Sequence, residues 1–179
     1  MAWRGRTQSG ASRVSAAEQF DPVPLIEALS DGGVDFVLIG GLAGIAHGSA
    51  YPTYDVDVMY ARDDENLERL ATVLRDLGAT LRGASPDLPF QLDARAIQEG
   101  GNFTFDTRNG PLDILAYPAG APPFAELREA SDKIELGGHT VRVASLNHMI
   151  AMKDAAARPK DQLMATEYRT LADERRSQS

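Results

Sequence analysis

The fold of this chain depends on the stretch FVLIGGLAGIAHGSAYPTYDVDVMY, which spans residues 36–60. A short apolar run ends at Gly40 and Gly41, small residues follow, and the stretch closes in an apolar strand that carries Asp55 and Asp57. Successive side chains of a strand point to opposite faces, so the two aspartates share one face. Neighbouring carboxylates repel each other unless a cation neutralises them or one takes a proton. The pattern therefore predicts a carboxylate pair, mounted on a core strand, that holds a divalent metal ion.

The available side chains narrow the choice of metal. The chain has no cysteine and only three histidines, so the donors are carboxylate oxygens. Such hard donors favour Mg²⁺ or Mn²⁺ over zinc, and magnesium is commonly shared between one or two carboxylates and substrate phosphates. An Asp-x-Asp pair beside a glycine turn therefore indicates nucleotide phosphate chemistry. The alternative is a solvated pair at a strand end, which carries no chemistry.

The glycine pair predicts a tight turn from a strand at residues 35–39 into a short helix at residues 41–47. Glycine has no Cβ, so a ligand can approach the backbone closely at Gly40 and Gly41. The start of a helix also offers unpaired amides to an anion, and we expect a triphosphate to rest there. Ser49 follows the helix, and its hydroxyl is a further candidate phosphate contact. The alternative is a turn that binds no ligand.

Hydrophobic periodicity and turn residues predict the other elements. An Asn-Gly pair at residues 109–110 and a Gly-Gly pair at residues 137–138 indicate two hairpins. Asp63 or Asp64 caps the longest periodic helix, Ser145 caps a later one, and Pro159 ends that helix or starts the next. Further helices are expected at residues 23–29, 64–77, 94–98, 146–153 and around 163–171, and strands at residues 54–60, 79–81, 102–106, 112–117, 133–136 and 140–143.

Asp113 is a third acidic candidate. It stands among apolar residues in the expected strand 112–117, where a buried carboxylate is costly unless it has a partner. The alternative is that Asp113 faces solvent near the turn, because an exposed edge avoids that cost.

These residues resemble the nucleotidyltransferase superfamily, which has the DNA polymerase beta-like fold. Gly40-Gly41, followed after thirteen residues by Asp55-Val56-Asp57, has the order and spacing of its signature, a glycine pair opening a helix and an Asp-x-Asp on the next strand. With His47-Gly48 and Thr53, the string is most similar to bacterial abortive-infection and toxin-type transferases, including those that modify tRNA. The resemblance extends over residues 20–171. Tyr51 and Tyr54 stand where relatives often carry basic residues.

The resemblance implies an α+β fold, with a mixed central sheet flanked by helices and with C-terminal helices. It also implies that Asp55, Asp57 and Asp113 hold one or two divalent ions, and that Asp113 either completes the metal site or accepts a proton from the attacking hydroxyl. The segment KDAAARPKD, residues 153–161, resembles a family segment with Lys, Arg, Lys and Asp at Lys153, Arg158, Lys160 and Asp161, of which Lys153 and Arg158 are the candidates for binding the triphosphate. The implied catalytic residues are Asp55, Asp57, Asp113 and Lys153, and the implied nucleotide-binding residues are Gly40, Gly41, Ser49, Thr53 and Arg158. The alternative for Lys153 and Arg158 is a solvated basic helix end.

The composition predicts one globular domain. The 179 residues are 43% apolar, which suffices for one core, so we expect a single domain at residues 20–179 and a flexible N-terminal arm at residues 1–19. Without cysteine, a signal-peptide pattern or an apolar run of membrane-span length, the chain is expected to be cytoplasmic, with no membrane partner.

The formal charge of -8 bears on the acceptor, because bulk attraction to nucleic acid requires lysines and arginines. The leading hypothesis, implied by the resemblance, is transfer of a nucleotide from an NTP to a hydroxyl of RNA, at a tRNA 3′ end, in a toxin–antitoxin or phage-defence setting with a cognate antitoxin as partner. The second is transfer to a small molecule such as an aminoglycoside or lincosamide, which the acidic balance favours if the acceptor is cationic. The third is a transferase-fold binding module or antitoxin without activity.

Overall fold

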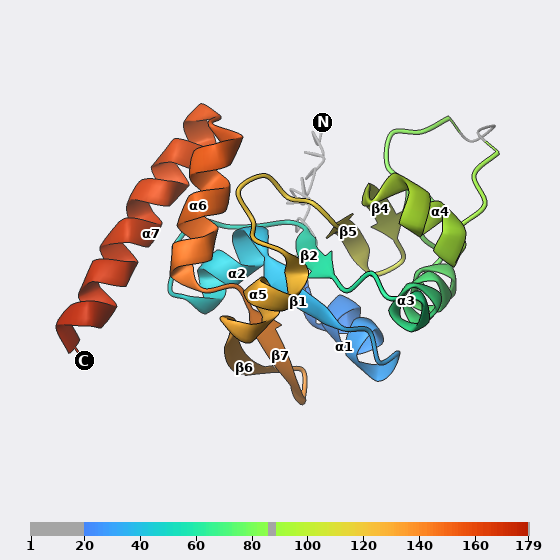
Figure 1. The fold of residues 1–179 in the computed structure, drawn as a ribbon, viewed down its shortest axis with the longest axis horizontal. Coiled ribbons are helices and arrows are strands. Elements are labelled where there is room, and N and C mark those ends of the chain that lie inside the picture. Colours follow the sequence, from blue (N-terminus) through green and yellow to red (C-terminus); the bar gives the residue numbers. More distant parts are fainter. Residues whose placement is uncertain (1–19, 86–88, 179) are drawn as a thin grey trace, which may run out of the picture.

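The structure of the protein is a computed structural model that describes residues 20–85 and 89–178 (Figure 1). The expected N-terminal arm, residues 1–19, lies outside the described residues. The described residues confirm the α+β class, with one seven-stranded mixed sheet in the order β3-β4-β5-β2-β1-β7-β6. The strands are β1 (Phe36–Ile39), β2 (Val56–Tyr60), β3 (Thr80–Leu81), β4 (Asn102–Thr107), β5 (Gly110–Leu115), β6 (Asp132–Leu136) and β7 (His139–Val143). The helices are α1 (Val23–Asp31), α2 (Gly40–Ala46), α3 (Asp64–Asp76), α4 (Ala94–Gly100), α5 (Phe124–Glu129), α6 (Leu146–Ala156) and α7 (Pro159–Gln178).

The centre of the sheet joins segments that lie far apart in the sequence. β2 pairs with β1 in the antiparallel direction, with Ile39 opposite Asp57. On its other edge β2 pairs with β5 in the parallel direction, with Asp57 opposite Asp113. The β4–β5 and β6–β7 hairpins, predicted from their Asn-Gly and Gly-Gly turns, form as expected.

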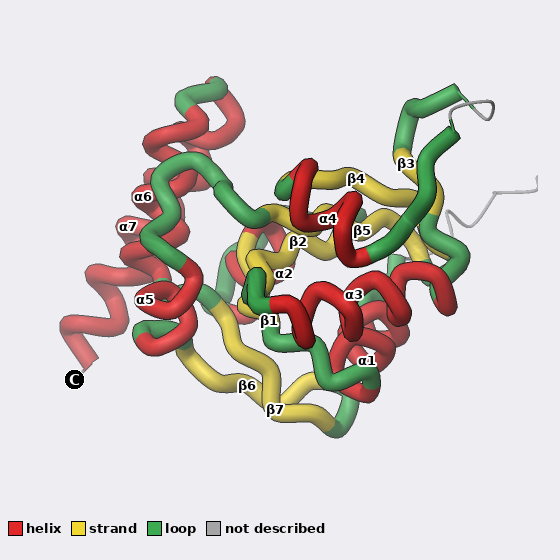
Figure 2. Tube along the Cα trace, turned by 45° about the vertical axis from the view of Figure 1, so that its right-hand side comes forward, coloured by secondary structure: helices red, strands yellow, loops and turns green. Residues whose placement is uncertain are grey.

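The helices gather at two sides of the sheet. α6 and α7 lie side by side at the left of the molecule in both views (Figures 1 and 2), and α3 and α4 contact each other and lie at the right in Figure 1. The core between them is formed by fully buried side chains such as Leu38, Val58, Leu70 and Ile114. Tyr168 of α7 is also fully buried, so the C-terminal helix belongs to this core. None of the described helices has the length and apolarity that crossing a membrane requires.

Local capping explains where α3 and α4 begin. The side chain of Asp63 accepts a hydrogen bond from the amide of Asn66 at 3.0 Å, as the sequence predicts. Asp93 does the same for the amide of Ala96 at 2.8 Å. Each carboxylate satisfies an amide that the first turn of the helix leaves unpaired.

The sequence misplaced the start of β2 and the end of β5. β2 begins at Val56 rather than Tyr54, so Asp55 precedes the strand. β5 ends at Leu115 rather than Tyr117, because the Asn102 side chain accepts from the amides of residues 116 and 117. Ser145 occupies the N-cap position of α6 as the sequence predicts, although its hydroxyl pairs with His148 Nδ1 at 3.0 Å instead of a backbone amide. The six-residue helix α5 was not predicted, because it is too short to show a period.

Asn66 joins α3 to the ends of β1 and β2. It is fully buried, its Oδ1 accepts from the amide of Asp35 at 2.7 Å, and its Nδ2 donates to the carbonyls of Asp35 and Ala61. We expect Asn66→Ala to lower the free energy of unfolding by about 2–4 kcal/mol, because buried backbone groups lose their partners. Urea denaturation measures this. Asn147→Ala, at an exposed helix position, is the matched control and should change the value by less than about 0.5 kcal/mol. Equal effects of the two variants would contradict this role.

Candidate active site

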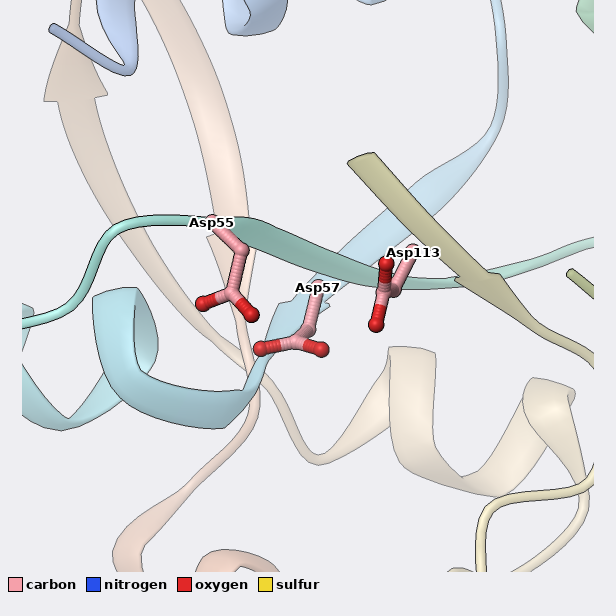
Figure 3. Close-up of side chains that lie close together, drawn as sticks. All are labelled: Asp55, Asp57 and Asp113. Atoms are coloured by element: carbon pink, nitrogen blue, oxygen red, sulfur yellow. The ribbon is translucent and has the colours of Figure 1, made fainter. Parts of the chain in front are cut away.

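Asp55, Asp57 and Asp113 converge at one edge of the central strands. Each offers a carboxylate oxygen, and the three oxygens lie within 4.8 Å of one another. Figure 3 shows the carboxylates on the same side of β2 and β5, with Asp57 between the other two. Two segments that are more than fifty residues apart in the sequence thus form one acidic cluster.

Strand register and a local hydrogen bond place these carboxylates. Asp57 and Asp113 are direct partners in the parallel β2–β5 ladder, and paired residues of adjacent strands project from the same face. Asp55 lies just before β2 and is held by Thr53, whose hydroxyl donates to Asp55 Oδ1 at 2.8 Å. The cluster is therefore fixed by rigid backbone on one side and by a side-chain contact on the other.

Gly40 and Gly41 allow the chain's own side chains to approach the helix start. Gly40 has a φ of +65°, and a Cβ there would lie 2.0 Å from Asp57 Oδ2. A Cβ at Gly41 would lie 2.6 Å from Thr53 Oγ1. The amide of Gly41 donates a hydrogen bond to the Asp57 carboxylate. The amide expected to meet a triphosphate is thus used to hold Asp57.

Burial and the short distances between the carboxylates raise the pKa values of Asp57 and Asp113. Burial, then repulsion by Asp55 and by Asp113, raises the pKa of Asp57 from 3.8 to about 7. Lys153 and the Gly41 amide act in the opposite direction. Burial also raises the pKa of Asp113, while its Arg82 neighbour opposes the shift. A cation placed among the three carboxylates would offset the repulsion that, after burial, raises the pKa of Asp57.

The donor set fits a hard divalent cation. All three candidate ligands are carboxylates, the type that Mg²⁺ and Mn²⁺ bind, and no thiolate is available in the chain. Asp113 Oδ1 is buried without a well-oriented hydrogen bond, although Arg82 Nη2 lies 3.0 Å away. This oxygen is therefore available to coordinate a metal ion.

Arg82 is a site residue that sequence reasoning missed. It follows β3, and its guanidinium contacts Asp113 Oδ1 at 3.0 Å, Asp106 Oδ1 at 3.1 Å and the carbonyl of Phe105 at 2.8 Å. It thus links the third carboxylate to β4. An arginine after a two-residue strand carries no local signal, because its role arises only from sheet pairing.

A cavity of about 440 Å³ opens beside Asp57 and Gly40. The ammonium of Lys153 lines it and pairs with Asp161 Oδ1 at 2.9 Å. Arg158 also lines it, lies 3.4 Å from Asp161 Oδ2, and leaves 82% of its side chain exposed. The structure thus brings both predicted basic residues to the cavity and adds the nearly buried Asp161, which holds them there.

The apolar part of the same cavity includes Leu115, Tyr117, Met149 and Met152. Tyr117 is 68% exposed, and the guanidinium carbon of Arg62 lies 5.1 Å from its ring centre. A cavity of this size, with apolar walls and convergent charges, has the character of a small-molecule site.

The two remaining predicted contacts have other partners. Ser49 donates to Glu167 Oε2 of α7 at 2.6 Å, and Thr53 donates to Asp55. Both hydroxyls therefore position the loop before β2. Their predicted contact with a nucleotide stays a prediction.

Comparison with known proteins identifies the fold. No protein-family model and no curated protein matches the sequence. The solved structure of the lincosamide antibiotic adenylyltransferase LnuA, with lincomycin bound, is similar with a TM-score of 0.55 and 13% identity, over 83% of this chain and 94% of that one. A nucleotidyltransferase-like protein from Paracoccidioides brasiliensis is similar with a TM-score of 0.53 and 17% identity, over 83% of this chain and 72% of that one. The chain has the nucleotidyltransferase fold, as the sequence predicts.

Proposed function

We propose that the protein is a metal-dependent nucleotidyltransferase that moves a nucleotide from an NTP to an acceptor hydroxyl. The observation that carries the proposal is the convergence of Asp55, Asp57 and Asp113 beside a cavity lined by Lys153 and Arg158. Transfer at phosphorus asks a protein mainly for positioning and for neutralisation of charge. The site provides a cluster of hard donors and an adjacent pair of cations.

Each residue has a defined role in this proposal. Asp55, Asp57 and Asp113 hold Mg²⁺ or Mn²⁺, which supplies Lewis-acid stabilisation of the reacting phosphate when it is bound. Lys153 acts as a point charge for the triphosphate, and Arg158 provides a two-pronged contact. Tyr117 and the methionines of the cavity give the base an apolar surface.

The transfer itself is a substitution at the α-phosphorus. The acceptor oxygen forms a bond to this phosphorus, the bond to the oxygen that bridges to the β-phosphate breaks, and pyrophosphate leaves with that electron pair. Asp113 accepts the proton of the attacking hydroxyl if it does not coordinate the metal; if it does, the proton passes to water. Lys153 and Arg158 balance the negative charge that the pyrophosphate gains.

We place the acceptor hydroxyl on RNA, with a tRNA 3′ end as the first candidate. The support is the similarity of residues 40–57 to toxin-type transferases, and a toxin–antitoxin or phage-defence setting with a restraining antitoxin belongs to the same proposal. A small-molecule acceptor is the second candidate. The fold similarity to the lincosamide adenylyltransferase and the chain's charge of -8 favour it.

The test is transfer of label from α-labelled NTPs, with Mg²⁺ and either total tRNA or a panel of aminoglycosides and lincosamides. We expect the wild type to label one acceptor class and Asp57→Ala to label none, because the cluster loses its central carboxylate. Addition of EDTA should likewise stop label transfer by the wild type. If the wild type labels no acceptor beyond the Asp57→Ala background, the activity is refuted and the binding-module alternative gains.

A further inference from the structure

A second cavity, of about 520 Å³, opens at the other end of the acidic cluster. Asp55 lines it, whereas Asp57 lines the first cavity. Near the start of α7, Lys160 lines the second cavity, and Arg158, which precedes the helix, lines the first. Asp55 and Asp57 therefore border two different cavities, which have different walls.

The second cavity is the side from which an acceptor would enter, and this step rests on the proposed function. In a substitution at phosphorus the attacking and leaving oxygens lie roughly in line on opposite sides. Lys153 and Arg158 draw the leaving pyrophosphate into the first cavity. The attacking hydroxyl then approaches from the side of Asp55.

One cation of the second cavity is available to an anionic acceptor. Arg82 neutralises Asp106, which its Nε contacts at 3.1 Å. Asp55 is neutralised when a divalent cation is bound. Lys160 is exposed, and no ion-pair partner for it occurs among the residues that the structure describes. The two acidic and two basic side chains of the lining balance each other, and Lys160 is the cation that can contact a single phosphate.

Two tyrosines give the cavity an aromatic wall. Tyr54 is 70% exposed and Tyr51 is 36% exposed, although both belong to the large side chains that usually bury part of their surface. Unpaired bases stack on exposed aromatic rings regardless of sequence, and Lys or Arg beside the ring tracks the backbone. The exposed tyrosines, with Lys160 beside them, are therefore suited to stack on the base of a nucleotide at the end of a single strand.

Hydrogen bonds hold the loop that carries these tyrosines in place. Glu167 of α7 accepts from the hydroxyl of Ser49 at 2.6 Å and from the amide of Ala50 at 2.9 Å. Ser49 Oγ in turn accepts from the amide of Tyr51 at 3.2 Å. A surface that is ordered before binding loses less entropy on association.

We propose that this cavity is the acceptor site and that it binds the 3′-terminal nucleotides of single-stranded RNA. The terminal base stacks on Tyr54, an adjacent phosphate contacts Lys160, and the free 3′ hydroxyl reaches the carboxylates past Asp55. The overall charge of -8 provides no bulk attraction to RNA, so contacts within this cavity must supply the affinity.

Fluorescence anisotropy of a short, 5′-labelled oligoribonucleotide, in Mg²⁺ with each variant at several salt concentrations, tests this site. We expect Tyr54→Ala to weaken binding about tenfold and Tyr54→Phe, which keeps the ring, to bind within about twofold of the wild type. We expect Lys160→Gln to weaken binding and to reduce the slope of log affinity against log salt by about 0.7. Lys133→Gln, an exposed lysine of the distant strand β6, is the matched control and should change neither quantity.

Separate measurement of NTP binding distinguishes this site from the transfer activity. Tyr54→Ala should leave the KM for NTP unchanged and raise the KM for an RNA acceptor. Unchanged RNA affinity in both Tyr54→Ala and Lys160→Gln would overturn the proposal, as would transfer to a lincosamide or aminoglycoside that depends on Tyr54. RNA binding that depends on Tyr54, in a protein that binds no NTP, would support this site and refute the proposed transfer.

Discussion

Replacing Asp57 by asparagine should abolish nucleotide transfer and, at the same time, stabilise the metal-free protein at neutral and higher pH. Asparagine has the same shape but no charge, so it removes the central metal ligand together with the repulsion from Asp55 and Asp113. We expect transfer to fall by at least about 10³-fold, since metal stabilisation of the reacting phosphate amounts to several kcal/mol. A substitution that lowers activity and raises stability is typical of a residue that is kept for function.

The stability effect depends on pH in a defined direction. The folded protein holds the Asp57 proton up to a pKa of about 7, whereas the unfolded chain releases it at about 3.8. The stabilisation of the folded protein that comes from protonated Asp57 is therefore complete below pH 3.8, and it is lost as the pH rises to about 7. Asp57→Asn should avoid this loss, which amounts to at most about 4 kcal/mol.

Thermal denaturation in EDTA, between pH 5 and pH 8, measures the difference in stability between Asp57→Asn and the wild type. The gap between Asp57→Asn and the wild type should widen with pH, while Asp76→Asn, at an exposed end of α3, should follow the wild type. Mg²⁺ should raise the wild-type melting temperature, by an amount equivalent to about 2.7 kcal/mol at a hundred times its Kd, and leave Asp57→Asn unchanged. A metal-free Asp57→Asn protein less stable than the wild type at pH 8 would show that the carboxylate is there for structure.

Replacing Gly40 by alanine should have the second largest effect. The new Cβ would lie 2.0 Å from Asp57 Oδ2, and the backbone at this position has a φ of +65°. We expect a loss of about 3 kcal/mol or more in the free energy of unfolding, because the left-handed conformation costs about 1–2 kcal/mol and the overlap costs about as much again. Displacement of Asp57 should also weaken Mg²⁺ binding.

Gly78→Ala separates the cost of the left-handed backbone conformation from the cost of the overlap with Asp57. Gly78 has a φ of +63°, nearly the same as that of Gly40, but a Cβ there meets nothing within 4 Å. Chemical denaturation should therefore show only the conformational cost of about 1–2 kcal/mol for Gly78→Ala, with unchanged Mg²⁺ binding. Equal losses in the two variants would mean that the contact with Asp57 does not matter.

Several features of the site were predictable from the sequence because they depend on short-range order. The Asp55–Asp57 pair, the glycine turn and the Asn-Gly hairpin each follow from chain geometry over a few residues. Asp113 was a candidate because an acidic residue in an apolar strand is costly without a partner, and its place beside Asp55 and Asp57 was implied by the family resemblance. The end of β5 was not predictable, because the Asn102 side chain that stops the ladder comes from the neighbouring strand.

The sequence by itself determined the kind of donors, the turn that precedes them and the strands that carry them, because these are properties of residue type and of neighbours in the chain. Only the tertiary structure decided which partners meet. The parallel pairing of β2 with β5 puts Asp57 beside Asp113, α7 brings Glu167 to Ser49, and Arg82 reaches the cluster from β3. These contacts join residues far apart in the sequence, and their geometry is set by burial of the whole core rather than by any local pattern.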